Sequence, residues 1–108
     1  MTLKKIRFLA LVVAAIMMMS SVAFAAYVYE SRYSHNTLKR GHENVYVLNL
    51  QTDINATKKA YCGTPDGIFG SGTESGVKDY QRKNGLSVDG QAGRDTKTTL
   101  WYEEGYKH

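Results

Sequence analysis

The stretch Asp66–Val77, "DGIFGSGTESGV", decides the fold, because a thinner copy of it, "DGQAGRDTKTTL", occupies Asp89–Leu100. The copies are offset by 23 residues, so that their aspartate, glycine and threonine positions coincide. In each copy an Asp-Gly pair has the composition of a tight turn, and a second glycine precedes a helical pattern. A repeated unit that cannot bury its apolar face alone needs its neighbour. The repetition therefore predicts two turn-and-helix units that pack together.

A helix is predicted before the first copy, over Asn44–Lys59. Val47, Leu50 and Ile54 recur there at spacings of three and four and form one apolar stripe. Asn44 is suited to cap the first turn, since its side-chain oxygen can accept a free backbone N–H. The stripe predicts that this helix packs against the two repeat helices.

Two more helices are predicted, one from each copy. The sequence Ser71–Glu74 fits a capping box, and the helix that it starts is expected to reach about Asn84. Gly85 is expected to end it in the left-handed conformation. The third helix is expected over Asp95–Glu103, and no strand pattern of useful length is present. The fold class predicted is all-α, a small three-helix bundle with two Asp-Gly turn-and-helix repeats.

The first 25 residues have the layout of a secretory signal peptide. Three basic residues precede an unbroken apolar run of 12 residues, Phe8–Met19, and the small-x-small sequence Ala23–Ala25 follows. The run is shorter than the roughly 20 residues that cross a bilayer. We expect cleavage after residue 25 and export to the periplasm, cell wall or medium. An uncleaved membrane anchor is the alternative.

Cleavage would leave 83 residues, enough for one small domain. Residues 26–40 hold three tyrosines without a sustained period and are interpreted as a tether or flexible arm. Residues 41–102 are expected to form the domain, and residues 103–108 a polar tail. Without the leader, 11 basic residues face 10 acidic ones, so the basic charge belongs largely to the leader. This near-neutral balance argues against a nucleic-acid partner.

The residues that could support catalysis form no convincing constellation. Cys62 is the only cysteine, and it is interpreted as a small buried side chain, with pairing between molecules left open. Ser75 and Lys78 match a short motif of penicillin-recognising enzymes, but Ser75 lies in the middle of a predicted helix. The three histidines lack the spacing of metal ligands. We therefore expect no catalytic residue, metal or cofactor.

The ordered positions resemble the peptidoglycan-binding-like domain, a small helical module attached to many cell-wall hydrolases and transpeptidases. The resemblance covers about Gly41–Trp101, nearly all of the expected mature chain. The matching positions are Val47, Leu50, Gln51, Asp66, Gly67, Phe69, Gly70, Thr73, Val77, Tyr80, Gln81, Gly85, Leu86, Asp89, Gly90, Gly93, Thr96 and Leu100. Four positions depart from the family pattern: Ser71 replaces Pro, Gly76 replaces Ala, Tyr80 replaces Phe, and Ala92 replaces a larger side chain.

The resemblance implies a non-catalytic module that binds bacterial peptidoglycan and brings a partner enzyme close to the wall. The expected ligand-binding residues are Gln51, Asp66, Phe69, Gly70, Tyr80 and Gln81, around a shallow groove beside the second helix. Each has a structural alternative: the Asp-Gly turns are explained by backbone geometry, Tyr80 by core packing, and the glutamines by bonds to loop backbone.

The sequence leaves the nature of the ligand open. It does not separate glycan from stem peptide. An envelope protein-protein interaction module, with a cell-wall hydrolase or another envelope protein as partner, is the alternative function. A cell-wall hydrolase, or a remnant of one, is the less favoured alternative.

Overall fold

The computed structural model describes residues 31–105, and the expected signal peptide over residues 1–25 lies outside them. Within this range the chain forms a small all-helical domain with three helices of seven or more residues, as expected. They are α3 (Val45–Thr57), α4 (Ser71–Lys83) and α5 (Arg94–Glu103). None of the helices in residues 31–105 is long and apolar enough to cross a membrane.

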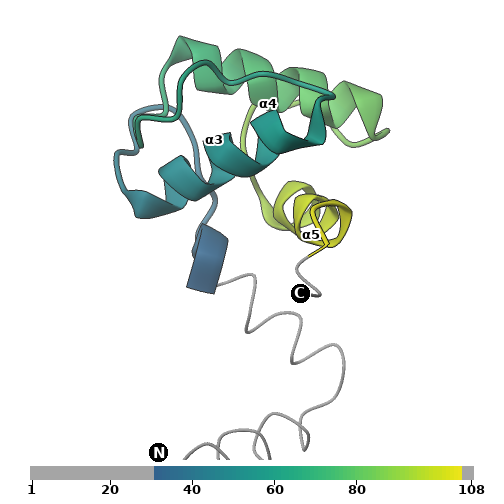
Figure 1. Cartoon of the computed structure of the whole chain (residues 1–108), viewed down its shortest axis with the longest axis horizontal. Coiled ribbons are helices and arrows are strands. Elements are labelled where there is room, and N and C mark those ends of the chain that lie inside the picture. Colours follow the sequence, from purple (N-terminus) through teal and green to yellow (C-terminus); the bar gives the residue numbers. More distant parts are fainter. Residues whose placement is uncertain (1–30, 106–108) are drawn as a thin grey trace, which may run out of the picture.

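Helix α3 is the centre of the bundle, since it packs against both α4 and α5. Figure 1 shows that α3 and α4 run in the same direction, so the connection between them returns along the full length of the pair. Helix α5 is seen almost end-on and lies crosswise to them. The fold is therefore a pair of parallel helices with a third across one end.

Two of the three predicted helix ends are confirmed. Asn44 caps α3, with its Oδ1 accepting the backbone N–H of Val47 at 3.0 Å. At the end of α4, Gly85 has a positive φ of 68°, and the N–H of Leu86 donates to the carbonyl of Gln81 at 2.9 Å. With the bond from Gly85 N–H to the Arg82 carbonyl, this is a Schellman motif.

The predicted capping box at the start of α4 is wrong. The helix begins at Ser71 with Gly70 as its N-cap, and no side chain caps it. The Thr73 hydroxyl bonds to the preceding loop instead, and Glu74 lies within 4 Å of the basic groups of Arg40 and Lys78. Position 70 does not need a glycine for its backbone conformation, because its φ of −100° is an angle that any residue can adopt.

The interpretation of residues 26–40 as a flexible arm is wrong for residues 31–40; residues 26–30 lie outside the described range. Tyr33 and Leu38 are buried in the core. The Arg32 guanidinium binds the carboxylate of Asp53 on α3 through two bonds of 2.6 and 2.7 Å. The buried Lys97 of α5 donates to the carbonyls of residues 34 and 36 at 3.0 and 2.9 Å. The hydrophobic period of the sequence could not reveal this, because only residues 31–33 of the segment are helical and residues 34–40 form no helix or strand.

The segment 38–44 also joins the two repeats through its backbone. Leu38 exchanges two hydrogen bonds with Ala92 of the second loop, at 3.1 and 2.8 Å. Further along, Phe69 of the first loop donates to the His42 carbonyl and accepts from Gly41. Since Phe69 and Ala92 are equivalent positions of the repeat, one segment holds both loops in the same way.

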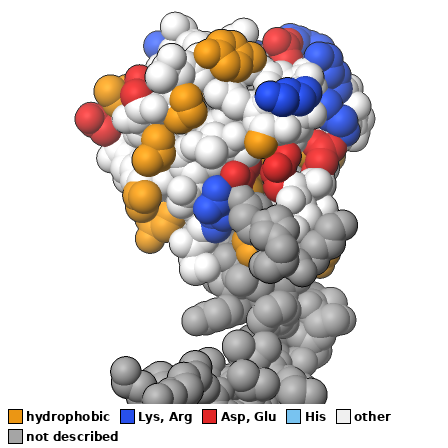
Figure 2. Space-filling view, viewed as in Figure 1, with side chains coloured by type: hydrophobic (Ala, Val, Ile, Leu, Met, Phe, Trp, Pro, Cys, Tyr) orange, Lys and Arg blue, Asp and Glu red, His pale blue; other side chains and the backbone are white. Residues whose placement is uncertain are grey.

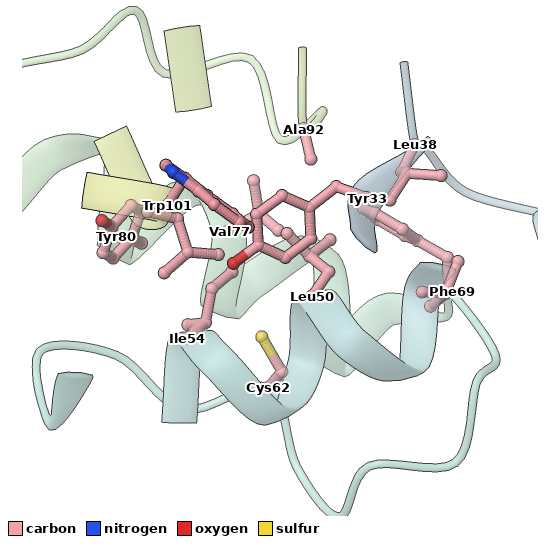
Figure 3. Close-up of a cluster of buried hydrophobic side chains, with 12 residues drawn as sticks. Tyr33, Leu38, Leu50, Ile54, Cys62, Phe69, Val77, Tyr80, Ala92 and Trp101 are labelled. Carbon is pink, nitrogen blue, oxygen red and sulfur yellow. The ribbon is translucent and has the colours of Figure 1, made fainter. Parts of the chain in front are cut away.

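The core is one continuous cluster that draws on every part of the described chain (Figure 3). Tyr33 lies at its middle, with Leu38 and Phe69 toward one end and Tyr80 and Trp101 toward the other. The remaining members are Val47, Leu50, Ile54, Cys62, Val77, Ala92 and Leu100. Residues from outside the three helices are thus part of the core and not a covering layer.

Gly76 of α4 allows the closest approach of two segments. A Cβ at this position would lie 2.6 Å from Cys62 Sγ and 2.8 Å from the Tyr61 carbonyl oxygen. We expect Gly76→Ala to destabilise the domain by about 1–3 kcal/mol, although alanine has the higher helix propensity. Thermal unfolding followed by circular dichroism measures it. Gly72→Ala is the control, because its Cβ would meet only the Cys62 carbonyl, at 3.5 Å. Equal stability of the two variants would contradict the steric explanation.

Candidate functional site

Four of the six residues expected to bind a ligand are inside the domain. Gln51, Phe69, Tyr80 and Gln81 are each at most 1% exposed. Asp66 is exposed and Gly70 half-buried, so these two alone reach the surface. Gln51 and Gln81 hold the Asp-Gly turns, and Phe69 and Tyr80 belong to the core, so the side chains of these four residues are buried in this structure.

Gln51 of α3 holds the first turn through a set of bonds that we call the first glutamine clamp. Its Nε2 group donates to the Asp66 carboxylate at 3.1 Å and to the Ile68 carbonyl at 3.0 Å. The same group lies 2.8 Å from Thr73 Oγ1. Its Oε1 accepts the backbone N–H groups of Asp66 and Gly67, both at 2.9 Å. The Gln51 side chain thus satisfies both hydrogen-bond donors and hydrogen-bond acceptors of the turn.

Gln81 of α4 forms the second glutamine clamp on the second turn. Its Nε2 donates to the carboxylate of Asp89 and to the carbonyl of Gln91, both at 2.9 Å, and to Thr96 Oγ1 at 3.1 Å. Its Oε1 accepts the backbone N–H groups of Asp89 and Gly90, at 3.1 and 3.0 Å. The two clamps match atom for atom.

The aspartates also organise their own turns. Asp66 Oδ1 accepts the N–H of Ile68 at 2.9 Å, and Asp89 Oδ1 accepts that of Gln91 at the same distance. The Ile68 N–H and then the Gln51 amide hold the pKa of Asp66 below its usual value, because both stabilise the charged carboxylate. The structural interpretation of the Asp-Gly motifs accounts for every one of these bonds.

Tyr80 is buried, and among residues 31–105 its hydroxyl has no hydrogen bond of normal geometry, although the Glu103 carboxylate lies near it. Burial, followed by the nearby Glu103 carboxylate, raises the pKa of Tyr80 well above its usual value. We expect Tyr80→Phe to leave stability unchanged or to raise it by up to about 1 kcal/mol, since it removes an unsatisfied polar atom. Urea unfolding tests this. Tyr33→Phe is the contrast: Tyr33 donates to Asp53, so the same deletion should destabilise. A loss of stability in Tyr80→Phe would reveal a partner for that hydroxyl.

A depression on the surface offers a candidate binding site. It has a volume of 490 Å³, is open to solvent and lies between the end of α3, the following connection and α4. Its lining includes Lys58, Lys59, Lys83 and the side chain of Tyr61, which is 68% exposed. Figure 2 shows Lys and Arg side chains gathered at the end of the molecule where α3 and α4 finish. We call this feature the basic depression.

Cys62 lies beneath the surface, against α4. Its Sγ lies 3.9 Å from the Thr73 carbonyl, and burial raises the pKa of its thiol to about 12. A thiol with this pKa is protonated at neutral pH and is a poor nucleophile. The Nδ1 atom of His42 accepts the backbone N–H of Lys39 at 3.3 Å. Over residues 31–105, no group of three or more His, Cys, Asp or Glu side chains is placed to hold a metal ion.

Comparison with known proteins identifies a family that matches the whole repeat region. A family model described as "Putative peptidoglycan binding domain" matches residues 44–100. The spore cortex-lytic enzyme of Bacillus cereus is 38% identical over 68 residues, which are 63% of this chain and 26% of that protein. The spore cortex-lytic enzyme of Oceanobacillus iheyensis is 31% identical over 74 residues, 68% of this chain and 26% of that protein. The chain thus matches about a quarter of the length of these relatives.

A solved structure shares the fold. The crystal structure of the SleB N-terminal domain superposes with a TM-score of 0.63 at 35% identity. The match covers 67% of this chain and 97% of that one. The similarity therefore extends over nearly all of that solved domain.

Proposed function

The chain belongs to the peptidoglycan-binding domain family, and on this premise we propose that it is an exported, non-catalytic module that attaches to bacterial peptidoglycan. The observation that carries the proposal is the match over residues 44–100, which contains both turns and both glutamine clamps. Attachment would raise the local concentration of a wall-active partner, as a tether does. Its place is the periplasm or the cell wall.

The absence of catalysis is part of the proposal. The protonated, buried thiol of Cys62 argues against a cysteine nucleophile. The similarity to the spore cortex-lytic enzymes extends over about a quarter of their length, and the solved domain it matches is N-terminal. These observations support a role in targeting or assisting a separate wall enzyme.

Sedimentation with purified sacculi tests the attachment. The full chain should co-sediment with insoluble peptidoglycan, and soluble wall fragments should compete with it. Retention in whole envelope extract but not on clean sacculi would overturn the proposal in favour of a protein partner. Zymography on a gel that contains peptidoglycan tests for cleavage, and a clearing zone would contradict the non-catalytic assignment.

A further inference from the structure

The basic depression has an unusual backbone at its rim. Lys58, the C-cap of α3, has a left-handed conformation with a φ of 63°. Glycine is the residue that adopts this conformation without cost, and a lysine there is strained. Strain of this kind at a surface position is a reason to look for a use of the side chain. The Lys58 side chain is exposed and forms no hydrogen bond or ion pair with any residue between 31 and 105.

The charges around the depression leave a positive surplus. Lys59 Nζ is paired with the Glu103 carboxylate and also bonds to Asn84 Oδ1 at 3.0 Å. The Asp79 carboxylate is likewise engaged, by Arg82 at 2.5 Å. Lys83 Nζ donates to the carbonyl of residue 59, which uses one of its three N–H groups and no charge. Among residues 31–105, Lys58 and Lys83 thus have no ion-pair partner, and the three lysines that line the depression outnumber its one carboxylate, that of Asp79.

Asn55, another polar residue that lines the depression, has no free group for a ligand. Asn55 uses both ends of its amide within the fold: Nδ2 donates to the Gly63 carbonyl at 2.9 Å, and Oδ1 accepts the Cys62 N–H at 2.8 Å. A ligand would meet the two ammonium groups, the exposed ring of Tyr61 and the Asp79 carboxylate, which is paired with Arg82. The Tyr61 backbone packs closely against Gly76, and its ring is exposed at the depression.

These observations fit a carboxylate next to an apolar side chain. Lysine ammonium groups form charge-assisted hydrogen bonds with carboxylates, which are roughly twice as strong as neutral ones. In peptidoglycan, carboxylates are carried by the peptide stems, whereas the hydroxyl and acetamido groups of the sugars are neutral. The volume of 490 Å³ is within the range of about 300–1,000 Å³ usual for small-ligand sites and suits a short peptide.

We propose that the basic depression binds a carboxylate of the peptidoglycan stem peptide, with Lys58 and Lys83 as its cationic partners and Tyr61 packed against the adjacent side chain. This inference rests on the proposed attachment to peptidoglycan and names the part of the polymer that is held. Lys58, in its left-handed conformation, would then lower the stability of the fold and strengthen ligand binding.

The sharpest variant is Lys58→Gly, because it should move stability and binding in opposite directions. Glycine relieves the strain, so the melting temperature should rise by roughly 2–8 °C. The loss of one charge-assisted hydrogen bond should weaken binding to sacculi about tenfold. Lys58→Gln should weaken binding similarly without the gain in stability, and Lys83→Arg should retain binding. Lys39→Gln is the control, since Lys39 is an exposed lysine that is not among the residues lining the depression.

The ligand is tested with a synthetic stem tetrapeptide and its fully amidated counterpart, both titrated into the full chain. Backbone amide shifts in residues 58–61 and 79–83 should follow the free acid, and the amide should bind about tenfold more weakly. Normal binding of the Lys58 variants to sacculi, competed by sugar oligomers alone, would overturn the inference and leave attachment to the wall intact. Binding that is lost on sacculi stripped of teichoic acid would also overturn it, since the anion would then be a phosphate. No binding of the unaltered chain to sacculi would instead overturn the proposed function.

Discussion

Replacing Gln51 with leucine is expected to destabilise the domain by about 3–5 kcal/mol, a large part of the total for a domain of this size. Leucine fills a similar volume, but it removes the partner of two backbone N–H groups, the part-buried one of Asp66 and the buried one of Gly67. It also leaves the Ile68 carbonyl and the Thr73 hydroxyl without the amide. Each buried group left unsatisfied costs about 1–3 kcal/mol.

Gln81→Leu provides the internal comparison, because the second clamp repeats the bonds of the first. We expect its effect to agree with that of Gln51→Leu within about 1 kcal/mol. Urea unfolding followed by circular dichroism measures both. Gln91→Leu is the matched control: its side chain is exposed, and only its backbone takes part in the clamp, so its effect should stay within about 0.5 kcal/mol. If Gln51→Leu unfolded at the same urea concentration as the unaltered chain, the clamp would not be what holds the turn.

The clamps show where sequence analysis of this chain succeeds and where it stops. The two Asp-Gly turns were predicted from local composition, and their glycines, Gly67 and Gly90, do have positive φ values of 82° and 75°. The glutamines that hold them were left between a structural and a ligand-binding role. Gln51 precedes its aspartate by 15 residues and Gln81 by 8, so the glutamines do not follow the spacing of the repeat. The one sequence feature that could have indicated their structural role is that each Asp-Gly turn follows a helix that contains a glutamine.

The predicted capping box of α4 failed for a related reason. Ser71–Glu74 has the sequence of a capping box, but Gly70 takes the N-cap position and the Glu74 carboxylate lies beside Arg40 and Lys78. Contacts outside the first turn thus differ from what the local pattern predicts. Gly76 likewise lowers helix propensity, and only the approach of the Cys62 segment explains it. Local patterns predicted the elements, and contacts between elements decided the details.

Replacing Tyr33 with alanine is the second change with a large expected effect, about 3–5 kcal/mol, which is the usual cost of truncating a buried aromatic side chain. Tyr33 is fully buried at the middle of the core in Figure 3. Its hydroxyl donates to Asp53, which also binds Arg32. The loss would therefore combine a cavity with a weakened buried carboxylate.

Two further variants separate these terms. Tyr33→Phe keeps the ring and removes only the hydrogen bond to the charged Asp53, so it should cost about 1.5–3 kcal/mol. Asn36→Ala is the control in the same segment, because the exposed Asn36 contributes its backbone carbonyl to Lys97. Its stability should stay within about 0.5 kcal/mol of the unaltered chain. A Tyr33→Ala variant as stable as Asn36→Ala would restore the interpretation of this segment as a tether.

The same reasoning predicts where the folding unit begins. The family match starts at residue 44, but a fragment that begins there lacks Tyr33, Leu38 and the backbone bonds that join the two loops. We expect a fragment of residues 44–105 to be largely unfolded and one of residues 31–105 to show cooperative unfolding. The buried side chains of Lys97 and Asp53 would each lose hydrogen-bond partners in the shorter fragment, so the fragment would lose buried polar contacts as well as hydrophobic contacts. Cooperative unfolding of both fragments at the same temperature would show that residues 31–43 do not contribute to the stability of the domain.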